Sequence, residues 1–297
     1  MQRNVATLDL GVLPVQASAA VELVVTLQYG WTNGLAGRMY IATSGDAVVR
    51  LPIPGDLAPL ALDARGRRLL LAQRPRPAAS TWTLVEHEIS TGAQRRIPLP
   101  EDVLLVAAAW LDEKRVVVMS DGEDPEDPDA SVAVIEMLNL VSGEHRRVWA
   151  TQGGSSGESG VACSPDGRLV AVTYLHPDDT STTAVIDLAG NTVTSLEITE
   201  ITPAGNQNWL DSTTLLCAPR WGRPLCTIDI HTHAERHLPY LDTPLARVGD
   251  LLIFRQFLDH SLQRQISAAT IGGSELEPWL IFGDTPIERV LAAVADV

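Results

Sequence analysis

The densest group of side chains that could bind a metal ion is formed by His231, His233 and His237. On a β-strand, the imidazoles of His231 and His233 would lie on one face, because side chains alternate between faces, and together they could bind a metal. The alternative is that these histidines lie in a solvated turn. The choice depends on the elements that carry them.

Other segments match chemical motifs only in part. The acidic run 121–129 has enough carboxylates for Ca²⁺ but lacks the spacing of a calcium loop, so we expect a solvated insertion. Residues 153–157 fit Gly-x-Ser-x-Gly, but a nucleophile elbow needs a strand before it and a helix after it. No phosphate-binding loop and no cysteine pair with metal spacing is present. We therefore expect no cofactor and no metal.

Internal repeats in the sequence predict the strands and turns that position these residues. Apolar strand cores recur after short turns, at 39–41, 69–71, 116–118, 169–171, 215–217 and 251–253. Residues 89–97 align without gaps to 140–148 and 230–238, and more loosely to 188–196. Each of these copies predicts a strand, a turn and a second strand.

Each repeat unit therefore predicts four short strands, in the best copy near 159–163, 169–174, 183–188 and 192–198. A four-stranded unit of this length is typical of a β-propeller blade. The sequence thus predicts an all-β, single-domain propeller with blades near 1–54, 55–100, 101–150, 155–200, 204–240 and 243–283. Seven blades are the alternative, if residues 21–27 belong to a blade of their own.

The ends of the chain and its cysteines carry further expectations. The N-terminal 36 residues would supply missing strands of the first or last blade, and residues 286–294 have the period of a short C-terminal helix. Cys217 and Cys226 could face each other across a hairpin, as a disulfide or as two buried thiols. The low, odd number of cysteines argues against a disulfide scaffold.

One segment carries a family resemblance. The sequence from Ser164 to Val172, Ser-Pro-Asp-Gly-Arg-Leu-Val-Ala-Val, resembles the repeat of TolB-like and WD40-like β-propellers. The resemblance implies a propeller of six or seven blades with a central channel and with ligands or partners on one face. It does not imply one activity, since propellers have many functions.

The repeats also favour one interpretation of the histidine cluster. His233 aligns with Gly92, Gly143 and Asn191, at a turn position that tolerates positive φ. We therefore expect these histidines in a turn at the outer edge of a blade, not in a metal site.

One group of candidate binding residues lies in a loop between second and third strands, and in the family such loops share a face with the connections between blades. These loops are 73–82, 120–131, 175–182, 218–224 and 255–263. Arg220, Trp221 and Arg223 could stack on a planar group and hold an anion. Asn206, Gln207 and Asn208 precede an innermost strand and could line the mouth of the channel. The alternative is that Trp221 only covers its hairpin.

Two functions remain open. The preferred hypothesis is a non-catalytic binding propeller that presents its loop-rich face to a protein or small-molecule ligand. The alternative is a lyase, hydrolase or isomerase acting on a small anionic molecule, with His176 or His260 as the acid or base. Arg220 and Arg223 would then stabilise developing negative charge.

The net charge and the hydropathy of the chain limit the classes of partner that we expect. The net charge of −15 repels a phosphate backbone, so nucleic acid is not expected as a partner. No signal peptide follows Met1, and residues 12–27 are too short and too polar to span a bilayer. We therefore expect a cytoplasmic protein without membrane contact, and the excess of Arg and Ala is typical of a bacterial source.

Overall fold

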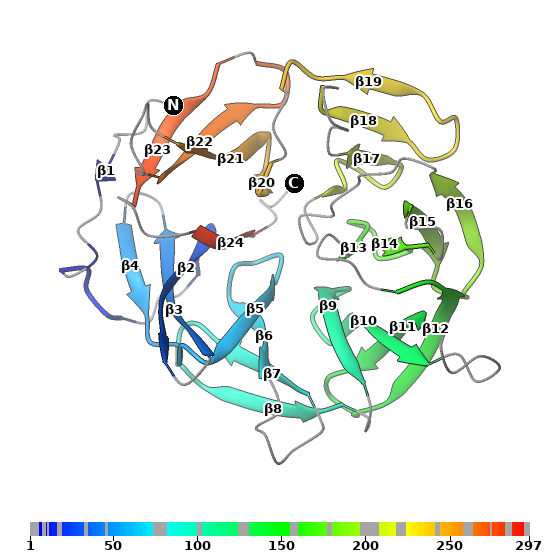
Figure 1. Cartoon of the computed structure of the whole chain (residues 1–297), viewed down its shortest axis with the longest axis horizontal. Coiled ribbons are helices and arrows are strands. Elements are labelled where there is room, and N and C mark those ends of the chain that lie inside the picture. Colours follow the sequence, from blue (N-terminus) through cyan, green and yellow to red (C-terminus); the bar gives the residue numbers. More distant parts are fainter. Residues whose placement is uncertain are drawn as a thin grey trace. The chain divides into compact units, whose positions relative to one another are not determined.

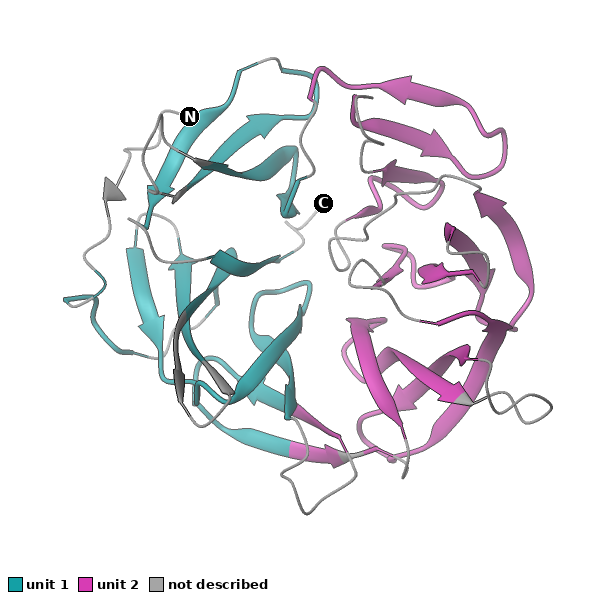
Figure 2. Ribbon diagram, in the orientation of Figure 1, with its two compact units in different colours: residues 1–73, 86–95, 243–297 teal, residues 74–85, 96–242 magenta. Residues whose placement is uncertain are grey.

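The computed structural model is an all-β chain that divides into two compact units (Figure 2). It describes residues 6–293 except 8–9, 11, 17–19, 33–34, 45–46, 74–81, 100–102, 124–130, 155–159, 177–179, 197–207, 218–223, 241–243, 258–263, 274 and 283–286. Unit 1 comprises residues 1–73, 86–95 and 243–297, and unit 2 comprises residues 74–85 and 96–242. No α-helix occurs in the described ranges.

Three sheets have most of their strands in unit 1 (Figure 1). The first contains β24 (Ile287–Ala292), β2 (Leu23–Thr32), β3 (Leu35–Ser44) and β4 (Ala47–Leu51). The second contains β5 (Leu57–Leu62), β6 (Arg68–Gln73), β7 (Thr83–Glu88) and β8 (Gln94–Pro98). The third contains β20 (Ala246–Val248), β21 (Leu251–Phe257), β22 (Arg264–Thr270), β23 (Glu277–Ile281) and β1 (Ala6–Thr7).

Unit 2 contains the other three sheets. One has β9 (Leu104–Trp110), β10 (Arg115–Glu123), β11 (Ser131–Asn139) and β12 (His145–Gln152). The next has β13 (Gly160–Cys163), β14 (Leu169–Leu175), β15 (Ser181–Asp187) and β16 (Thr192–Leu196). The last has β17 (Thr214–Cys217), β18 (Cys226–Asp229) and β19 (Glu235–His237), and Trp209 adds an isolated bridge to Leu215. These six sheets are the blades of the predicted β-propeller.

The hairpins between third and fourth strands have the predicted turn. Gly92, Gly143 and His233 have φ of 72°, 72° and 58°, so the repeat alignment holds at this position. In the looser copy the positive φ belongs to Gly190, at 91°, and not to Asn191. The alignment was wrong by one residue there because that loop is shorter: Asp187 pairs with Asn191, whereas Glu88 pairs with Ala93.

The core lies between neighbouring blades inside each unit. In unit 2, Val117 and Ile135 pack with Val172 and Ile186 of the next sheet. The fully buried Trp209 packs in the following cluster, and its indole N–H donates to the carbonyl of Ala162 at 3.0 Å. A blade therefore buries a face only where a neighbouring blade packs against that face.

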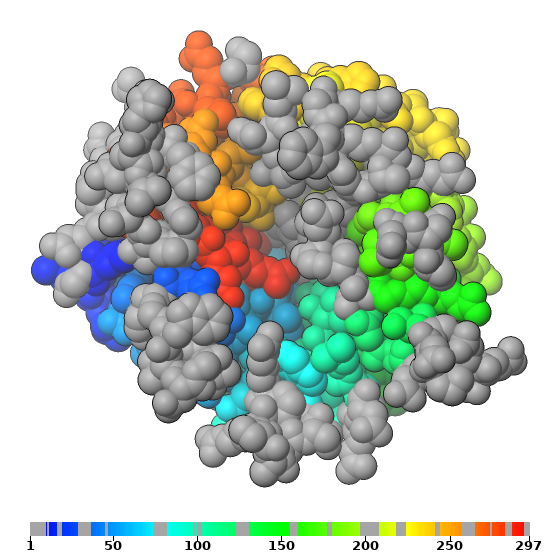
Figure 3. All heavy atoms as spheres, viewed as in Figure 1, coloured from blue at the N-terminus to red at the C-terminus, as the bar shows by residue number. Residues whose placement is uncertain are grey.

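The predicted C-terminal helix is wrong, because residues 287–292 form strand β24, which pairs antiparallel with β2. Ile287, Val290 and Ala292 join the same apolar cluster as Leu23 and Val25. A helix this short is not stable alone, whereas the edge of β2 offers a complete hydrogen-bonding ladder. In Figure 3 the red C-terminal residues accordingly lie against the blue N-terminal ones.

The N-terminal segment contributes to two blades of unit 1. β1 pairs in parallel with β23, whereas β2 forms a sheet with β3, β4 and β24. Because β2 belongs to that sheet, residues 21–27 do not form a seventh blade. Among the described residues, no helix is long and apolar enough to cross a membrane.

Candidate functional site

The two ends of each blade carry different loops. At one end, the backbone N–H after the third strand donates to the turn between the first two strands: Ile89 to Arg67, Leu140 to Lys114 and Ile230 to Thr213. At the other end, Gly154 of a connection between blades exchanges two 2.9 Å hydrogen bonds with Leu175, where the second strand leads into the third. We call this second end the loop end. In this blade the connection and the loop between second and third strands share one end, as expected.

The residues predicted to bind a ligand fall mostly outside the described part of the chain. Arg220, Trp221, Arg223, Asn206 and Gln207 lie there, and their role stays a prediction. The remaining one is described: Asn208 is buried, and its Nδ2 donates to the carbonyl of Leu216 at 3.4 Å. Its side chain therefore takes part in the packing of its own blade.

The two candidate acid–base histidines are only partly described. His176 is exposed at the loop end of its blade, where its backbone N–H donates to the carbonyl of Thr180 at 2.8 Å. His260 lies outside the described residues. The catalytic role of either side chain therefore remains a prediction.

His231 and His233 lie in the turn between β18 and β19, at the end of their blade opposite the loop end. The prediction that all three histidines lie in this turn is wrong for His237, which ends strand β19 and pairs with Cys226. His231, His233 and His237 are exposed, and the Nε2 of His233 lies 3.0 Å from the Thr194 hydroxyl of the neighbouring blade. In the described ranges no three His, Cys, Asp or Glu side chains are placed to hold a metal ion. The turn interpretation of His233 is confirmed by its φ.

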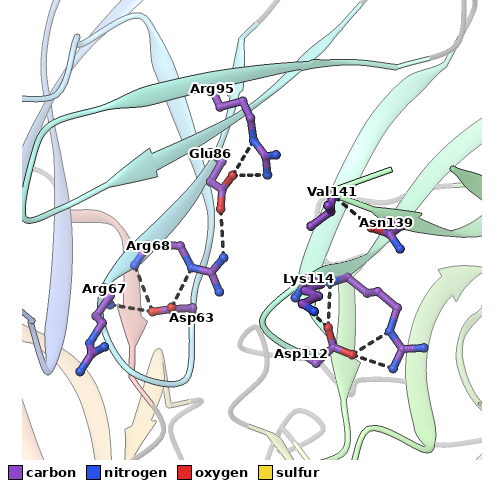
Figure 4. A network of polar contacts seen from close by, with 10 residues as sticks. Asp63, Arg67, Arg68, Glu86, Arg95, Asp112, Lys114, Asn139 and Val141 are labelled. Carbon is purple, nitrogen blue, oxygen red and sulfur yellow. Dashed lines mark hydrogen bonds and ion pairs between the residues drawn. The ribbon is translucent and has the colours of Figure 1, made fainter. Parts of the chain in front are cut away.

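In two blades, an aspartate side chain stabilises the turn between the first and second strands (Figure 4). Asp63 accepts hydrogen bonds from the backbone N–H of Arg67 and Arg68, and Asp112 accepts them from Lys114 and Arg115. Burial raises the pKa of Asp112, but the hydrogen bonds outweigh it, so that the pKa lies below its usual value. These carboxylates are therefore occupied in holding the turns.

Figure 4 also shows a ladder of charges across one sheet of unit 1. Arg68 on β6 lies 3.1 Å from Glu86 on β7, which in turn pairs with Arg95 on β8. Asp63, whose Oδ2 lies 3.2 Å from Arg68, supplies a second carboxylate, so that two arginines and two carboxylates neutralise one another.

A different polar group lies at the loop end of two neighbouring blades in unit 1. It consists of Arg38 and Tyr40 of β3, Glu288 and Arg289 of β24, Asp56 before β5, and Gln73 at the end of β6. We call these six residues the loop-end cluster. A register shift in the pairing of β2 with β24 leaves Glu288 as an extra residue beside Arg289. Such bulges re-aim side chains and are frequent beside functional sites.

The charges of the loop-end cluster are only partly matched. The Arg38 guanidinium binds both carboxylate oxygens of Glu288, with Nε–Oε2 and Nη2–Oε1 distances of 2.7 Å. In contrast, the one hydrogen bond that the structure describes for the Arg289 guanidinium goes to the carbonyl of Pro59, at 3.0 Å. Arg289 thus retains donors, and its charge has no hydrogen-bonded carboxylate among the described residues.

Burial shifts the ionisation of two members of the cluster. It raises the pKa of Tyr40, whose hydroxyl donates to the carbonyl of Leu57 at 2.5 Å. It lowers the pKa of Arg289, although Glu288 opposes this shift. Arg289 nevertheless stays a cation at neutral pH, because a guanidinium does not deprotonate in that range. A partly desolvated cation with unused donors is suited to binding an anion.

Sequence reasoning missed this cluster entirely. Arg38 and Glu288 are 250 residues apart, and Glu288 and Arg289 lay in the predicted helix. No local motif connects these positions, because two strand pairings bring them together.

Comparisons with known proteins identify the fold. No protein-family model and no curated protein matches the chain. Among solved structures, TolB from Acinetobacter baumannii has a TM-score of 0.58 at 13% identity, covering 94% of this chain and 68% of that one. A prolyl endopeptidase has a TM-score of 0.50 at 16% identity, covering 88% of this chain and 42% of that one. An oligogalacturonate lyase from Vibrio parahaemolyticus has a TM-score of 0.49 at 9% identity, covering 89% and 74%. At these sequence identities, the structural similarity to TolB and to the endopeptidase supports a β-propeller fold and does not indicate a shared activity.

Proposed function

We propose that this protein is a non-catalytic binding propeller that holds a protein or small-molecule ligand at the loop ends of its blades, through an anionic group of that ligand. The observation that carries the proposal is the guanidinium of Arg289, which lies at a bulge of β24 and is hydrogen-bonded to the carbonyl of Pro59. The pair of Arg220 and Arg223 around Trp221, in a loop of the same type, supports it from the sequence.

The proposal has a specific energetic basis. A hydrogen bond between a charged donor and a ligand carboxylate or phosphate is stronger than one between neutral groups, and contributes about 1.5–3 kcal/mol. Arg38 is already neutralised by Glu288, so Arg289 is the cation of the loop-end cluster that is available to a ligand. Its carbonyl partner holds the guanidinium in place before a ligand arrives.

The test is a binding screen followed by a matched pair of variants. Thermal shift with carboxylated and phosphorylated small molecules and acidic peptides identifies a ligand, and calorimetry measures its affinity. Arg289→Gln should weaken binding about 10-fold to 100-fold. The control, Arg236→Gln, changes an exposed arginine of the outer strand β19 and should leave the affinity unchanged.

Two results would count against the proposal. Equal affinity of Arg289→Gln and the unchanged chain would remove Arg289 from the site. Chemical conversion of the bound ligand on prolonged incubation would support the enzyme alternative instead. If Arg289→Gln melts early without ligand, Arg289→Lys serves as the variant, since it keeps the charge but loses the planar donor geometry.

A further inference from the structure

Two cysteines face each other directly across a pair of antiparallel strands in unit 2. Cys217 ends β17, Cys226 begins β18, and the two residues are register partners. Both are buried, both belong to one apolar cluster, and neither forms a disulfide. The Sγ of Cys217 donates to the carbonyl oxygen of Leu215, at 3.8 Å.

This placement meets the geometric requirement for a disulfide. Directly opposed residues of an antiparallel pair have Cβ atoms about 4.5–5.5 Å apart, whereas a disulfide has a Cβ–Cβ separation of about 3.8 Å. A bond can therefore form with a small approach of the two strands. A bond that needs such an approach is under strain, and strained disulfides are the ones that are readily reduced again.

The two thiols are not equivalent. The neighbouring Cys217 thiol lowers the pKa of Cys226, although burial opposes this shift. The Cys226 thiol, together with burial, raises the pKa of Cys217. Cys226 also keeps 8% of its surface exposed, compared with 0% for Cys217. Cys226 is therefore the better nucleophile and the more accessible sulfur atom.

We propose that Cys217 and Cys226 are a redox modification site, at which a small disulfide oxidant of the glutathione type converts the two thiols into a reversible intramolecular disulfide. The inference goes beyond the proposed function and does not depend on any ligand. It rests on the register of the two residues and on the apolar cluster that both side chains join.

The reaction proceeds by two exchanges. The Cys226 thiolate attacks one sulfur of the oxidant, the S–S bond of the oxidant breaks, and one thiol of the oxidant leaves with a proton. Cys217 then loses its proton and attacks the sulfur of Cys226, which releases the second thiol of the oxidant. The two protein thiols together lose two electrons and two protons, and one molecule of oxidant is reduced to two thiols.

The experiment counts thiols in the full-length folded chain. The chain is incubated with glutathione disulfide or with dithiothreitol, then denatured and alkylated, and its mass is measured by mass spectrometry. The chain contains three cysteines, so we expect three alkylated thiols in the reduced sample and one, Cys163, after oxidation. Trypsin cleaves after Arg220, between the two cysteines. The oxidised sample should therefore contain two linked peptides that dithiothreitol separates.

Single Cys→Ser variants identify which two cysteines form the disulfide. Cys163→Ser should still form it, because Cys163 is buried on a different strand, β13. Cys217→Ser and Cys226→Ser should each lose the linked peptides, with circular dichroism confirming that they fold. Peptide mapping of the unchanged chain and of Cys163→Ser decides the question even if the other two variants do not fold.

The proposal is overturned if all three thiols of the folded chain remain alkylatable after oxidation. It is equally overturned if glutathione stays attached to Cys226 while Cys217 can still be alkylated. Either result would mean that the opposed thiols do not reach bonding distance.

Discussion

At the scale of single residues, two turn glycines have the same backbone conformation in different surroundings. Gly66 and Gly92 have φ of 65° and 72°, a region that costs other residues about 1–2 kcal/mol. A Cβ on Gly92 would have nothing within 4 Å, whereas one on Gly66 would lie 1.8 Å from the carbonyl oxygen of Val21. We therefore expect Gly92→Ala to cost about 1 kcal/mol and Gly66→Ala considerably more, as measured by urea unfolding.

Gly272 supplies the control for this prediction. A Cβ there has open space, and Gly272 is not among the described residues with positive φ. Gly272→Ala should change the free energy of unfolding by less than about 0.5 kcal/mol. Equal losses for Gly66→Ala and Gly92→Ala would show that the approach of Val21 is not a constraint.

At the scale of elements, the acidic turn residues make the blades sensitive to acid. Asp211 accepts hydrogen bonds from the backbone N–H of Thr213 and Thr214, at 2.7 and 2.8 Å. Burial raises its pKa, but these bonds outweigh burial, so the folded-state pKa lies below the usual value. The stability that this carboxylate contributes is thus present above the unfolded-state pKa and is lost as the pH falls through the folded-state pKa.

We therefore expect the free energy of unfolding to fall between about pH 5 and pH 2, and Asp211→Asn to make this fall less steep. Denaturant titrations at several pH values measure both effects. Asn139 is the control, because its uncharged Oδ1 accepts the same kind of bonds, from Val141 and Ser142. Asn139→Ala should lower stability equally at every pH, and an unchanged slope for Asp211→Asn would contradict the prediction.

The elements also show what the sequence could predict. The hairpins at 89–97, 140–148 and 230–238 were predictable because turn and strand signals lie within a few residues of each other. The strand at 287–292 was not, because nine residues with apolar positions three or four apart suit a short helix as well as a strand. Its partner β2, which decides between them, lies at the other end of the sequence.

The same reasoning applies to the candidate site. The loop of Arg220, Trp221 and Arg223 was found from residue types alone, because its chemistry is contiguous. The loop-end cluster could not be found this way, since Arg38, Asp56 and Glu288 meet only after strands far apart in the sequence have paired. Tertiary pairing, rather than local pattern, creates that group.

At the scale of the whole molecule, β24 completes the first blade of unit 1. Its removal would leave the edge of β2 unpaired and would expose the cluster that contains Leu23, Val25 and Ile41. We expect a chain without residues 287–297 to lose cooperative thermal unfolding in that blade and to aggregate, because an exposed apolar edge strand pairs with other chains. Differential scanning calorimetry and light scattering measure the two effects.

Removal of residues 1–7 is the matched control. That segment contributes β1, which pairs with β23 at two positions, Ala6 with Leu280 and Thr7 with Ile281. Its loss should lower the melting temperature only slightly and leave the light scattering of the chain unchanged. Equal damage from both truncations would contradict the central role assigned to β24.

The pairing of β2 with β24 also has a consequence for synthesis on the ribosome. Positions joined in this blade, such as Arg38 and Glu288, are 250 residues apart. Because synthesis proceeds at about 5–20 residues per second, strand β24 is made roughly 10 to 50 s after the N-terminal strands with which it forms a sheet. During that interval the nascent chain carries an unfinished sheet, a stage at which holdase chaperones would protect it.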